Sequence, residues 1–153
     1  MAEATVRVWK NGWFHTGDVL KVDEAGNYYF VDRVKDVIRR RGENISSYEV
    51  ELEVLSFPSV NAAAAYGALV DTGEGEVMIA VESTNGTKID PLQLTEHLIK
   101  RLPYFMVPRF VRTVSSLPRS TTDKIDKTTL RSEGVTPDTW DREQAGIRLR
   151  RPR

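Results

Sequence analysis

The sequence of 153 residues contains no cysteine and only two histidines. The missing cysteine excludes disulfides, thiolate catalysis and cysteine-ligated metal sites, and it fits a reducing compartment. Acidic and basic residues balance at 22 each, so no overall charge favours nucleic acid or an anionic membrane as a partner. No apolar run approaches the ~20 residues of a membrane-spanning helix, and residues 1–4 begin neither a signal nor a transit peptide. We therefore expect a soluble cytoplasmic protein of one domain, or of one domain and part of another.

A glycine-rich loop that could cradle a phosphate is also missing. The stretch most dense in glycine, residues 71–75 (Asp-Thr-Gly-Glu-Gly), is not followed directly by a helix signal, which such a loop requires. We expect an ordinary turn there, between strands at 60–70 and 76–82. Because the charges balance over the whole sequence, any anion site in this chain must be local.

The first part of the chain has the pattern of short strands rich in aromatic residues. Residues 5–10 alternate between apolar and charged, as a half-buried strand does, and Asn11 with Gly12 is a strong turn signal. Residues 19–31 predict a hairpin with its turn at 23–27. Aromatic side chains in so short a segment indicate a surface that packs against something else.

The second part has signals for both helices and strands. Ser46 followed by Glu49 forms a capping box, and Asp90 followed by Pro91 is a typical helix start. These signals and the apolar patterns predict a strand at 110–114 and helices at 46–57, 90–103 and 127–131. From Gly134 onward, the mixture of proline, glycine and charged residues predicts a poorly ordered tail. The expected fold is α+β, with an N-terminal β-hairpin segment, a connector, and a small three-stranded sheet packed by about three helices.

The connector, residues 32–45 (Asp-Arg-Val-Lys-Asp-Val-Ile-Arg-Arg-Arg-Gly-Glu-Asn-Ile), is dense in charges of both signs. Taken alone, it is as consistent with a solvated linker as with a functional site. Its neighbours are residues 12–18 (Gly-Trp-Phe-His-Thr-Gly-Asp) and 117–127 (Leu-Pro-Arg-Ser-Thr-Thr-Asp-Lys-Ile-Asp-Lys). In this order, the three segments resemble the C-terminal end of adenylate-forming enzymes. This superfamily contains acyl-CoA synthetases, peptide-synthetase adenylation domains and firefly luciferase.

The resemblance spans residues 5 to 133 and implies a division of the chain. Residues 1–34 would be the remnant of a large N-terminal domain, residues 35–133 a mobile C-terminal lid domain, and residues 134–153 a tail. The lid would swing about a hinge at Lys35, between an adenylating and a thioester-forming pose. The side chain of a hinge residue must stay solvated at both endpoints, and lysine meets this condition.

Three residues are implied to serve the adenylation step. Asp18 would hold the ribose hydroxyls of ATP, and Arg33 would bind ribose and phosphate oxygens with its planar donors. Lys124 would be catalytic, because it could neutralise the charge that builds up when a carboxylate attacks the α-phosphate. The plain alternatives are an ordinary turn at Asp18 and a solvated turn at Lys124. No metal site is expected in the chain itself, and Mg²⁺ would accompany ATP in the full-length enzyme.

The family motif around the catalytic lysine is usually Thr-x-x-Gly-Lys, followed by an apolar residue. In this sequence Asp123 takes the place of the usual glycine. We expect this departure either to restrict the loop, or to place a carboxylate beside Lys124 and weaken its attraction for ATP.

The stretch after the hinge is implied to face coenzyme A. Gly42 stands where the family places a glycine beside the pantetheine channel, and a residue without Cβ lets a thin thiol-bearing arm pass close to the backbone. Arg39 and Glu43 would lie on the same face, and the arginine run 39–41 is a candidate for binding the phosphates of coenzyme A. An ordinary hairpin turn at Gly42 stays open as an alternative.

The expected function is that of the lid of an ATP-dependent, AMP-forming acyl-CoA ligase. Such an enzyme converts a small carboxylic acid, ATP and coenzyme A into acyl-CoA, AMP and pyrophosphate. Without its N-terminal adenylation domain, the chain alone is expected to be inactive. The alternatives are the lid of a carrier-protein-dependent adenylation domain, a stand-alone noncatalytic module that docks through the aromatic face of residues 8–30, and a plain interaction domain. The acid that is activated cannot be read, because the acyl pocket is absent.

Overall fold

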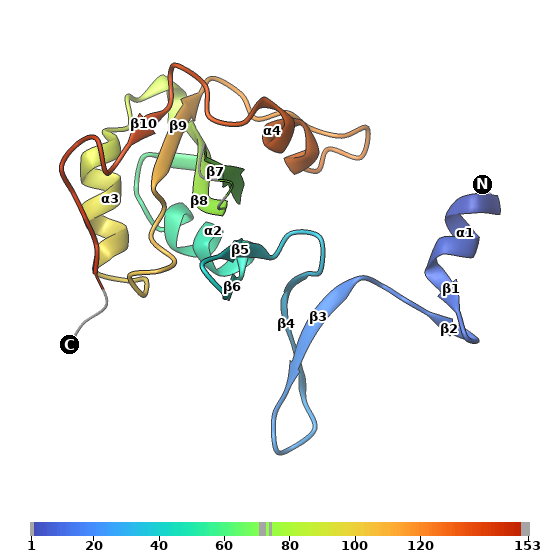
Figure 1. Ribbon diagram of the computed structural model, residues 1–153. Coiled ribbons are helices and arrows are strands. Elements are labelled where there is room, and N and C mark those ends of the chain that lie inside the picture. Colours follow the sequence, from blue (N-terminus) through green and yellow to red (C-terminus); the bar gives the residue numbers. More distant parts are fainter. Residues whose placement is uncertain (1, 71–72, 74, 151–153) are drawn as a thin grey trace.

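The computed structural model describes residues 2–70, 73 and 75–150, so the turn expected at 71–75 falls largely outside it. At the centre lies a four-stranded mixed sheet in the order β10-β9-β8-β7 (Figure 1). The α+β fold is confirmed, with one more strand than the three expected. β7 and β8 form a long antiparallel pair, β9 runs parallel to β8, and β10 is antiparallel to β9. The bounds are β7 (Val60–Leu69), β8 (Gly75–Ser83), β9 (Phe110–Val114) and β10 (Trp140–Asp141).

Both faces of this sheet are covered, which explains why β7 and β8 are almost continuously apolar. Side chains alternate between the two faces along a strand, so Ile79 joins one hydrophobic core and Met78 the other. The first core is closed by α2 (Ser47–Leu55) and α3 (Pro91–Ile99), and the second by α4 (Lys127–Glu133). The helices therefore hold the sheet from both sides.

The starts of α2 and α3 are fixed by side chains that cap their first backbone N–H groups. Ser46 Oγ accepts a hydrogen bond from Glu49 N (3.1 Å), and Asp90 Oδ1 accepts one from Leu92 N (2.9 Å). These caps satisfy donors that have no partner inside the helix. The helix starts predicted at these two residues are confirmed, and α3 provides the crossover that the parallel strands β8 and β9 require.

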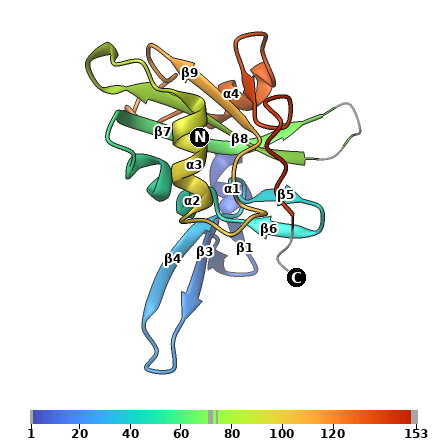
Figure 2. The same cartoon turned by 90° about the vertical axis from the view of Figure 1, so that its left-hand side faces the viewer.

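Residues 2–33, called the arm below, extend away from the sheet in Figure 1, and the β3–β4 hairpin also projects from it in Figure 2. β3 pairs with β4 in the hairpin predicted from the sequence. The arm consists of α1 (Ala2–Val8), β1 (Trp9–Lys10), β2 (Trp13–Phe14), β3 (Asp18–Val22) and β4 (Tyr28–Arg33). Residues 36–150 are called the body, which also contains β5 (Ile38–Arg40), β6 (Glu43–Ile45) and a 3₁₀ turn at Thr84–Gly86.

The segment 5–10, expected to be a strand, is a first correction, because most of it lies in α1. A strand needs a neighbour for its N–H and C=O groups. Within the described residues, only Trp9 and Lys10 of this segment find one, in β2. The residues before them form a helix instead, which pairs backbone groups internally.

The poorly ordered tail expected from Gly134 is a second correction. β10 pairs with β9, and Arg142 directly after it is fully buried. The Arg142 guanidinium donates to the carbonyl oxygens of Pro108 (3.2 Å) and Ile147 (2.8 Å). These hydrogen bonds hold the segment after Gly134 against the sheet, although its composition is typical of a loop.

Candidate functional site

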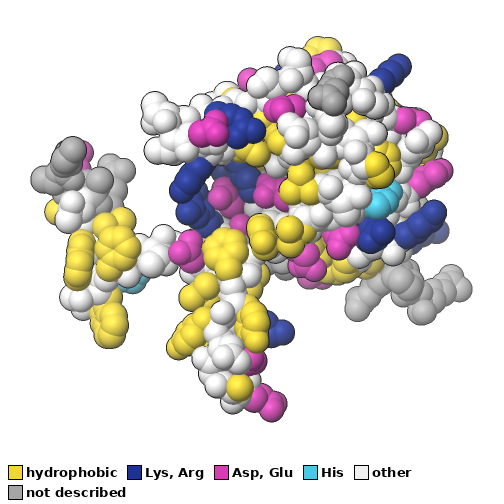
Figure 3. All heavy atoms as spheres, turned by 180° about the vertical axis from the view of Figure 1, so that it is seen from behind, with side chains coloured by type: hydrophobic (Ala, Val, Ile, Leu, Met, Phe, Trp, Pro, Cys, Tyr) yellow, Lys and Arg dark blue, Asp and Glu magenta, His cyan; other side chains and the backbone are white. Residues whose placement is uncertain are grey.

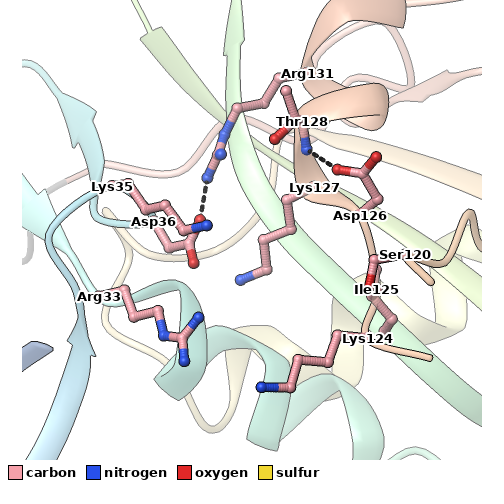
Figure 4. A pocket seen from close by; sticks show the side chains of 10 residues that line it. All are labelled: Arg33, Lys35, Asp36, Ser120, Lys124, Ile125, Asp126, Lys127, Thr128 and Arg131. Atoms are coloured by element: carbon pink, nitrogen blue, oxygen red, sulfur yellow. Dashed lines mark hydrogen bonds and ion pairs between the residues drawn. The ribbon is translucent and has the colours of Figure 1, made fainter. Parts of the chain in front are cut away.

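A cleft of about 200 Å³ lies where the arm meets the body (Figure 4). One wall is the end of β4 with the turn that follows it, and it contributes Arg33, Lys35 and Asp36. The opposite wall is the loop before α4 with the first turns of that helix, and it is lined by Ser120, Lys124, Ile125, Asp126, Lys127, Thr128 and Arg131. Of the site residues predicted from the sequence, Arg33, Lys35 and Lys124 come together in this cleft.

The loop that carries Lys124 is a tight hairpin. Arg119 and Ile125 form an antiparallel bridge, and Ser120 N donates to the carbonyl oxygen of Lys124 at 2.7 Å. The Lys124 side chain is exposed and has no hydrogen bond or ion pair with any residue that the structure describes. Its ammonium group can therefore approach an anionic ligand without breaking another contact.

Asp123 lies in this loop with a φ of 60°, in the left-handed region that glycine adopts without strain. Aspartate tolerates this region better than most residues. This backbone conformation explains why the resembled motif usually has glycine at this position. The Asp123 carboxylate is 87% exposed and lies 3.6 Å from Arg119 Nη1, so its ion pair is with Arg119 and not with Lys124.

Lys35 lies in the turn that joins the arm to the body. Asp36 N and Val37 N both donate to the carbonyl oxygen of Arg33, at 2.8 and 3.1 Å, and the Lys35 side chain is exposed. A short turn with a solvated side chain meets the requirements for a hinge. The hinge role itself stays a prediction.

Asp18 and Arg33 face each other across the β3–β4 hairpin. Asp18 Oδ1 lies 3.6 Å from Arg33 Nε, and both side chains are partly exposed. A second hollow of about 380 Å³ opens beside this pair and is lined by Thr16, Gly17, Arg33, Val34 and Lys35. Asp18 does not line the first cleft, but its partner Arg33 borders both hollows.

Sequence reasoning missed a buried polar network next to the cleft. Asp32, which is 3% exposed, accepts hydrogen bonds from Ser47 N (2.6 Å) and Ser47 Oγ (3.1 Å). Lys127 Nζ donates to Ser47 Oγ (2.8 Å) and forms an ion pair with Glu51 Oε1 (2.7 Å). Burial raises the pKa of Glu51, against the opposing effects of Lys127 and of the hydrogen bond from Ala65 N.

α4 connects this network to the hinge turn. Arg131, one helical turn after Lys127, places Nη2 2.7 Å from Asp36 Oδ1. Two cations at i and i+4 share one face of a helix, and this spacing directly after the Lys124 loop is the signal that could have identified them. α4, which follows the Lys124 loop, therefore contacts the chain on both sides of Lys35. It contacts Asp36 directly, and it reaches Asp32 through Ser47.

The residues predicted to face coenzyme A lie on the β5–β6 hairpin, outside the cleft. Arg41 and Gly42 form its two-residue turn with φ values of 48° and 84°, so the hairpin turn considered as an alternative is present. Glycine suits the second position of such a turn. A Cβ on Gly42 would meet no described atom within 4 Å, and Arg39 and Glu43 are exposed. The space beside this hairpin is therefore open.

Two arginines of the run 39–41 are engaged within the body. Arg40 is buried, with Nε 2.6 Å from Glu76 Oε2, and its Nη1 donates to the carbonyl oxygen of Phe105 at 3.0 Å. Arg41 Nη2 lies 3.2 Å from the other carboxylate oxygen of Glu76. Of this run, the described contacts leave only Arg39 for an external anion.

The family model of the AMP-binding enzyme C-terminal domain matches residues 49–124. The chain belongs to this family. The match begins in α2, includes the sheet strands β7, β8 and β9, and ends at Lys124, so the lysine loop closes the matched region.

Curated relatives of this AMP-binding C-terminal domain include CoA ligases. The chain is 36% identical over 131 residues to the long-chain-fatty-acid–CoA ligase FadD13 of Mycobacterium tuberculosis, and 43% identical over 126 residues to a feruloyl-CoA synthase of an Amycolatopsis species. These alignments cover 86% and 82% of the chain, and 26% of each relative. The chain thus spans about a quarter of the length of the curated relatives that it matches.

Solved structures of adenylate-forming enzymes share the fold of this domain. The chain superposes on ATP-bound MatB from Rhodopseudomonas palustris with a TM-score of 0.76 at 32% identity, covering 87% of this chain and 27% of MatB. On apo MatB, the TM-score is 0.67 at 33% identity over the same shares of both chains. The chain therefore superposes better on ATP-bound MatB than on apo MatB.

The cleft of this family member is rich in positive charge, with five Lys or Arg side chains and two aspartates among its lining residues. Among the described residues, no group of three or more histidine, aspartate or glutamate side chains could hold a metal ion. None of the helices in the described ranges is long and apolar enough to cross a membrane. The charge of the cleft suits an anionic ligand.

Proposed function

We propose that this chain is the mobile lid of an AMP-forming acyl-CoA ligase and works with a large adenylation domain. The reaction converts a carboxylic acid, MgATP and coenzyme A into acyl-CoA, AMP and pyrophosphate. The observation that carries the proposal is the cleft in which Lys124 and Arg33 meet from distant parts of the sequence. The CoA ligases among the relatives support coenzyme A, rather than a carrier protein, as the acyl acceptor.

In the first half-reaction, a carboxylate oxygen of the acid attacks the α-phosphorus of ATP and pyrophosphate leaves. Two anions approach each other, and negative charge builds on the transferring oxygens. Lys124 would stabilise this charge, since fixed cations at such positions lower the barrier without reorganising. Arg33, which lines this cleft, and its ion-pair partner Asp18, which does not, would hold the ribose and phosphate oxygens.

In the second half-reaction, the thiol of coenzyme A attacks the acyl carbon and AMP leaves. The lid would rotate about Lys35 and present the β5–β6 hairpin, with Arg39, Gly42 and Glu43, to the entering pantetheine. The exposure of these residues and the open space at Gly42 support this assignment. The better superposition on ATP-bound than on apo MatB supports the present pose as the adenylating one.

The relatives of this lid differ in the acid that their names give. The two relatives compared above are named for a long-chain fatty acid and for ferulic acid. These acids differ in size and in chemistry although the matching domains are similar. We therefore assign the reaction class from the lid and leave the choice of acid to the adenylation domain.

The decisive experiment replaces Lys124 by alanine in the ligase that contains this lid. We expect the rate of adenylate formation, measured as acid-dependent pyrophosphate release, to fall about 10²–10³-fold. Thioester formation from a supplied acyl-AMP should stay within about threefold, because Lys124 acts before that step. The matched control is Lys88→Ala, which removes an exposed lysine that does not line the cleft. The assignment is wrong if adenylate formation is unchanged while thioester formation falls.

A further inference from the structure

Four residues form direct contacts across the hinge turn. Val31 and Asp32 lie at the end of β4, before Lys35, and Ser46 and Ser47 lie at the start of α2, after it. Ser46 Oγ donates to the carbonyl oxygen of Val31 at 2.8 Å. Ser47 donates to both carboxylate oxygens of Asp32, from N at 2.6 Å and from Oγ at 3.1 Å. These three hydrogen bonds join the segment before Lys35 to the segment after it, and so join the arm to the body.

The Asp32 carboxylate is buried and accepts one hydrogen bond within the arm, from Arg33 N at 2.7 Å, so these contacts with Ser47 supply its other partners. It is 3% exposed and Ser47 is fully buried, and a buried charge needs hydrogen-bond partners to be tolerated. The nearest cation of the network is Lys127, whose Nζ donates to Ser47 Oγ at 2.8 Å. The hydroxyl of Ser47 therefore links a carboxylate of the arm to a cation of α4.

Rotation about Lys35 separates these contacts into two groups. Contacts of Asp32 and Val31 with α2 join opposite sides of the pivot, so they must break when the body turns relative to the arm. Contacts of Lys127 with Ser47 and Glu51 lie wholly in the body and survive the rotation. In the structure described, the network is complete while Lys124 and Arg33 line one cleft.

We infer that Asp32 is a positioning residue that latches the body in the Lys124-facing pose, through Ser47 and the Lys127 ammonium behind it. The role in catalysis rests on the function proposed above. Asp32 does not line the cleft, so it acts through the orientation of α2 and α4. Loss of the latch should favour the other pose and slow the half-reaction that needs Lys124.

The latch can be tested in the present chain without any catalysis, because the chain contains no native cysteine. Lys21→Cys in the arm and Thr121→Cys in the body replace exposed side chains, and spin labels at both report the distance between arm and body. We expect one narrow distance population in the parent. Asp32→Ala should broaden it or add a longer distance, and Asp32→Asn, which retains an acceptor oxygen, should give an intermediate result.

The matched control is Glu51→Gln, which removes the carboxylate that pairs directly with Lys127, a contact that does not cross the pivot. It should leave the distance distribution of the parent unchanged, provided that circular dichroism shows the variant to be folded. The latch is refuted if Asp32→Ala keeps the parental distribution, or if Glu51→Gln changes it as much. Neither outcome depends on whether the ligase function is correct.

The catalytic consequence is tested in the ligase that contains this lid. Asp32→Ala should slow adenylate formation about tenfold, the loss expected for one charge-assisted hydrogen bond, and should leave thioester formation from supplied acyl-AMP unchanged or faster. Equal slowing of both half-reactions would contradict a positioning role. If Asp32→Ala slowed only adenylate formation while Lys124→Ala had no effect, the proposed function would be wrong and the latch would still be supported.

Discussion

The arm leaves most of its large apolar side chains exposed, whereas the body buries most of its own. The body buries them in two cores, one on each face of the sheet. Along residues 3–31, none of the side chains that the structure describes is buried, and Trp13 and Tyr28 are 75% and 71% exposed. Figure 3 shows these apolar side chains gathered on the projecting hairpins. Exposed apolar clusters of this kind mark surfaces that another surface covers, so we expect the arm, unlike the body, to be completed by contacts outside this chain.

The largest effect should come from the buried charge pair of the body. Glu76→Ala removes the carboxylate that binds Arg40 at 2.6 Å and leaves that guanidinium buried with the Phe105 carbonyl. Breaking such a pair typically costs about 3–5 kcal/mol. Guanidinium chloride unfolding should show this loss, whereas Glu96→Ala, at an exposed position of α3, should change the unfolding free energy by less than about 0.5 kcal/mol. Equal midpoints for the two variants would contradict the prediction.

The body also shows which features the sequence can predict. Helix starts at Ser46 and Asp90 were predictable because a cap contacts N–H groups only a few residues away. The strand at 110–114 has the predicted bounds. β10 was missed because it depends on Arg142, whose hydrogen bonds reach Pro108 far back in the sequence. A local sequence pattern predicts hydrogen bonds between residues close in the sequence. It does not predict hydrogen bonds between residues far apart in the sequence, such as Arg142 and Pro108.

In the candidate site the same limit applies. Motif order led to the expectation that Arg33 and Lys124 act together, and the structure brings them to one cleft. Asp32 and Lys127 are ordinary polar residues in the sequence, and their importance comes only from packing between distant segments. In the sequence, the arginine run 39–41 has the pattern of one basic patch. In the structure, Glu76 of β8 pairs with two of these three arginines.

A smaller effect is expected at the loop that lies opposite the arm. Asp123 has a φ of 60°, where a residue with Cβ is strained and glycine is not. Asp123→Gly should therefore be more stable than Asp123→Ala by about 1–2 kcal/mol, as measured by denaturant unfolding. Loss of the exposed ion pair with Arg119 is common to both variants and cancels in this comparison. An alanine variant as stable as the glycine variant would show that the loop changes its backbone conformation.

On the arm, the β3–β4 turn should respond to acid. Hydrogen bonds from the side chain and backbone of Asn27 and from the Tyr29 hydroxyl lower the pKa of Asp23 to about 2. Because the pKa is lower in the folded hairpin than in the unfolded chain, the stabilisation is present above pH 3.8 and is lost as the pH falls through about 2. NMR titration should give this value, and Asn27→Ala should raise it. An unchanged pKa in that variant would assign the shift to Tyr29 or to the backbone.

The smallest effect on stability should come from the most exposed tryptophan. Trp13→Ala should change the unfolding free energy of this chain by less than about 0.5 kcal/mol, because the ring is 75% exposed. Leu98→Ala in the body, at a fully buried position, is the matched control and should cost about 2–5 kcal/mol. A loss above about 1 kcal/mol for Trp13→Ala would mean that the arm packs against the body in solution.

The same tryptophan variant separates the two ways in which the arm could be covered. If the arm completes an adenylation domain within one enzyme, Trp13→Ala should destabilise the full-length ligase much more than it destabilises this chain. If the chain is instead a stand-alone docking module, Trp13→Ala should weaken its binding to a separately supplied adenylation domain, and the parent should bind that domain tightly without ATP. Calorimetric titration of the two proteins distinguishes these cases, because a lid that must rotate during catalysis requires weak affinity between its body and the adenylation domain.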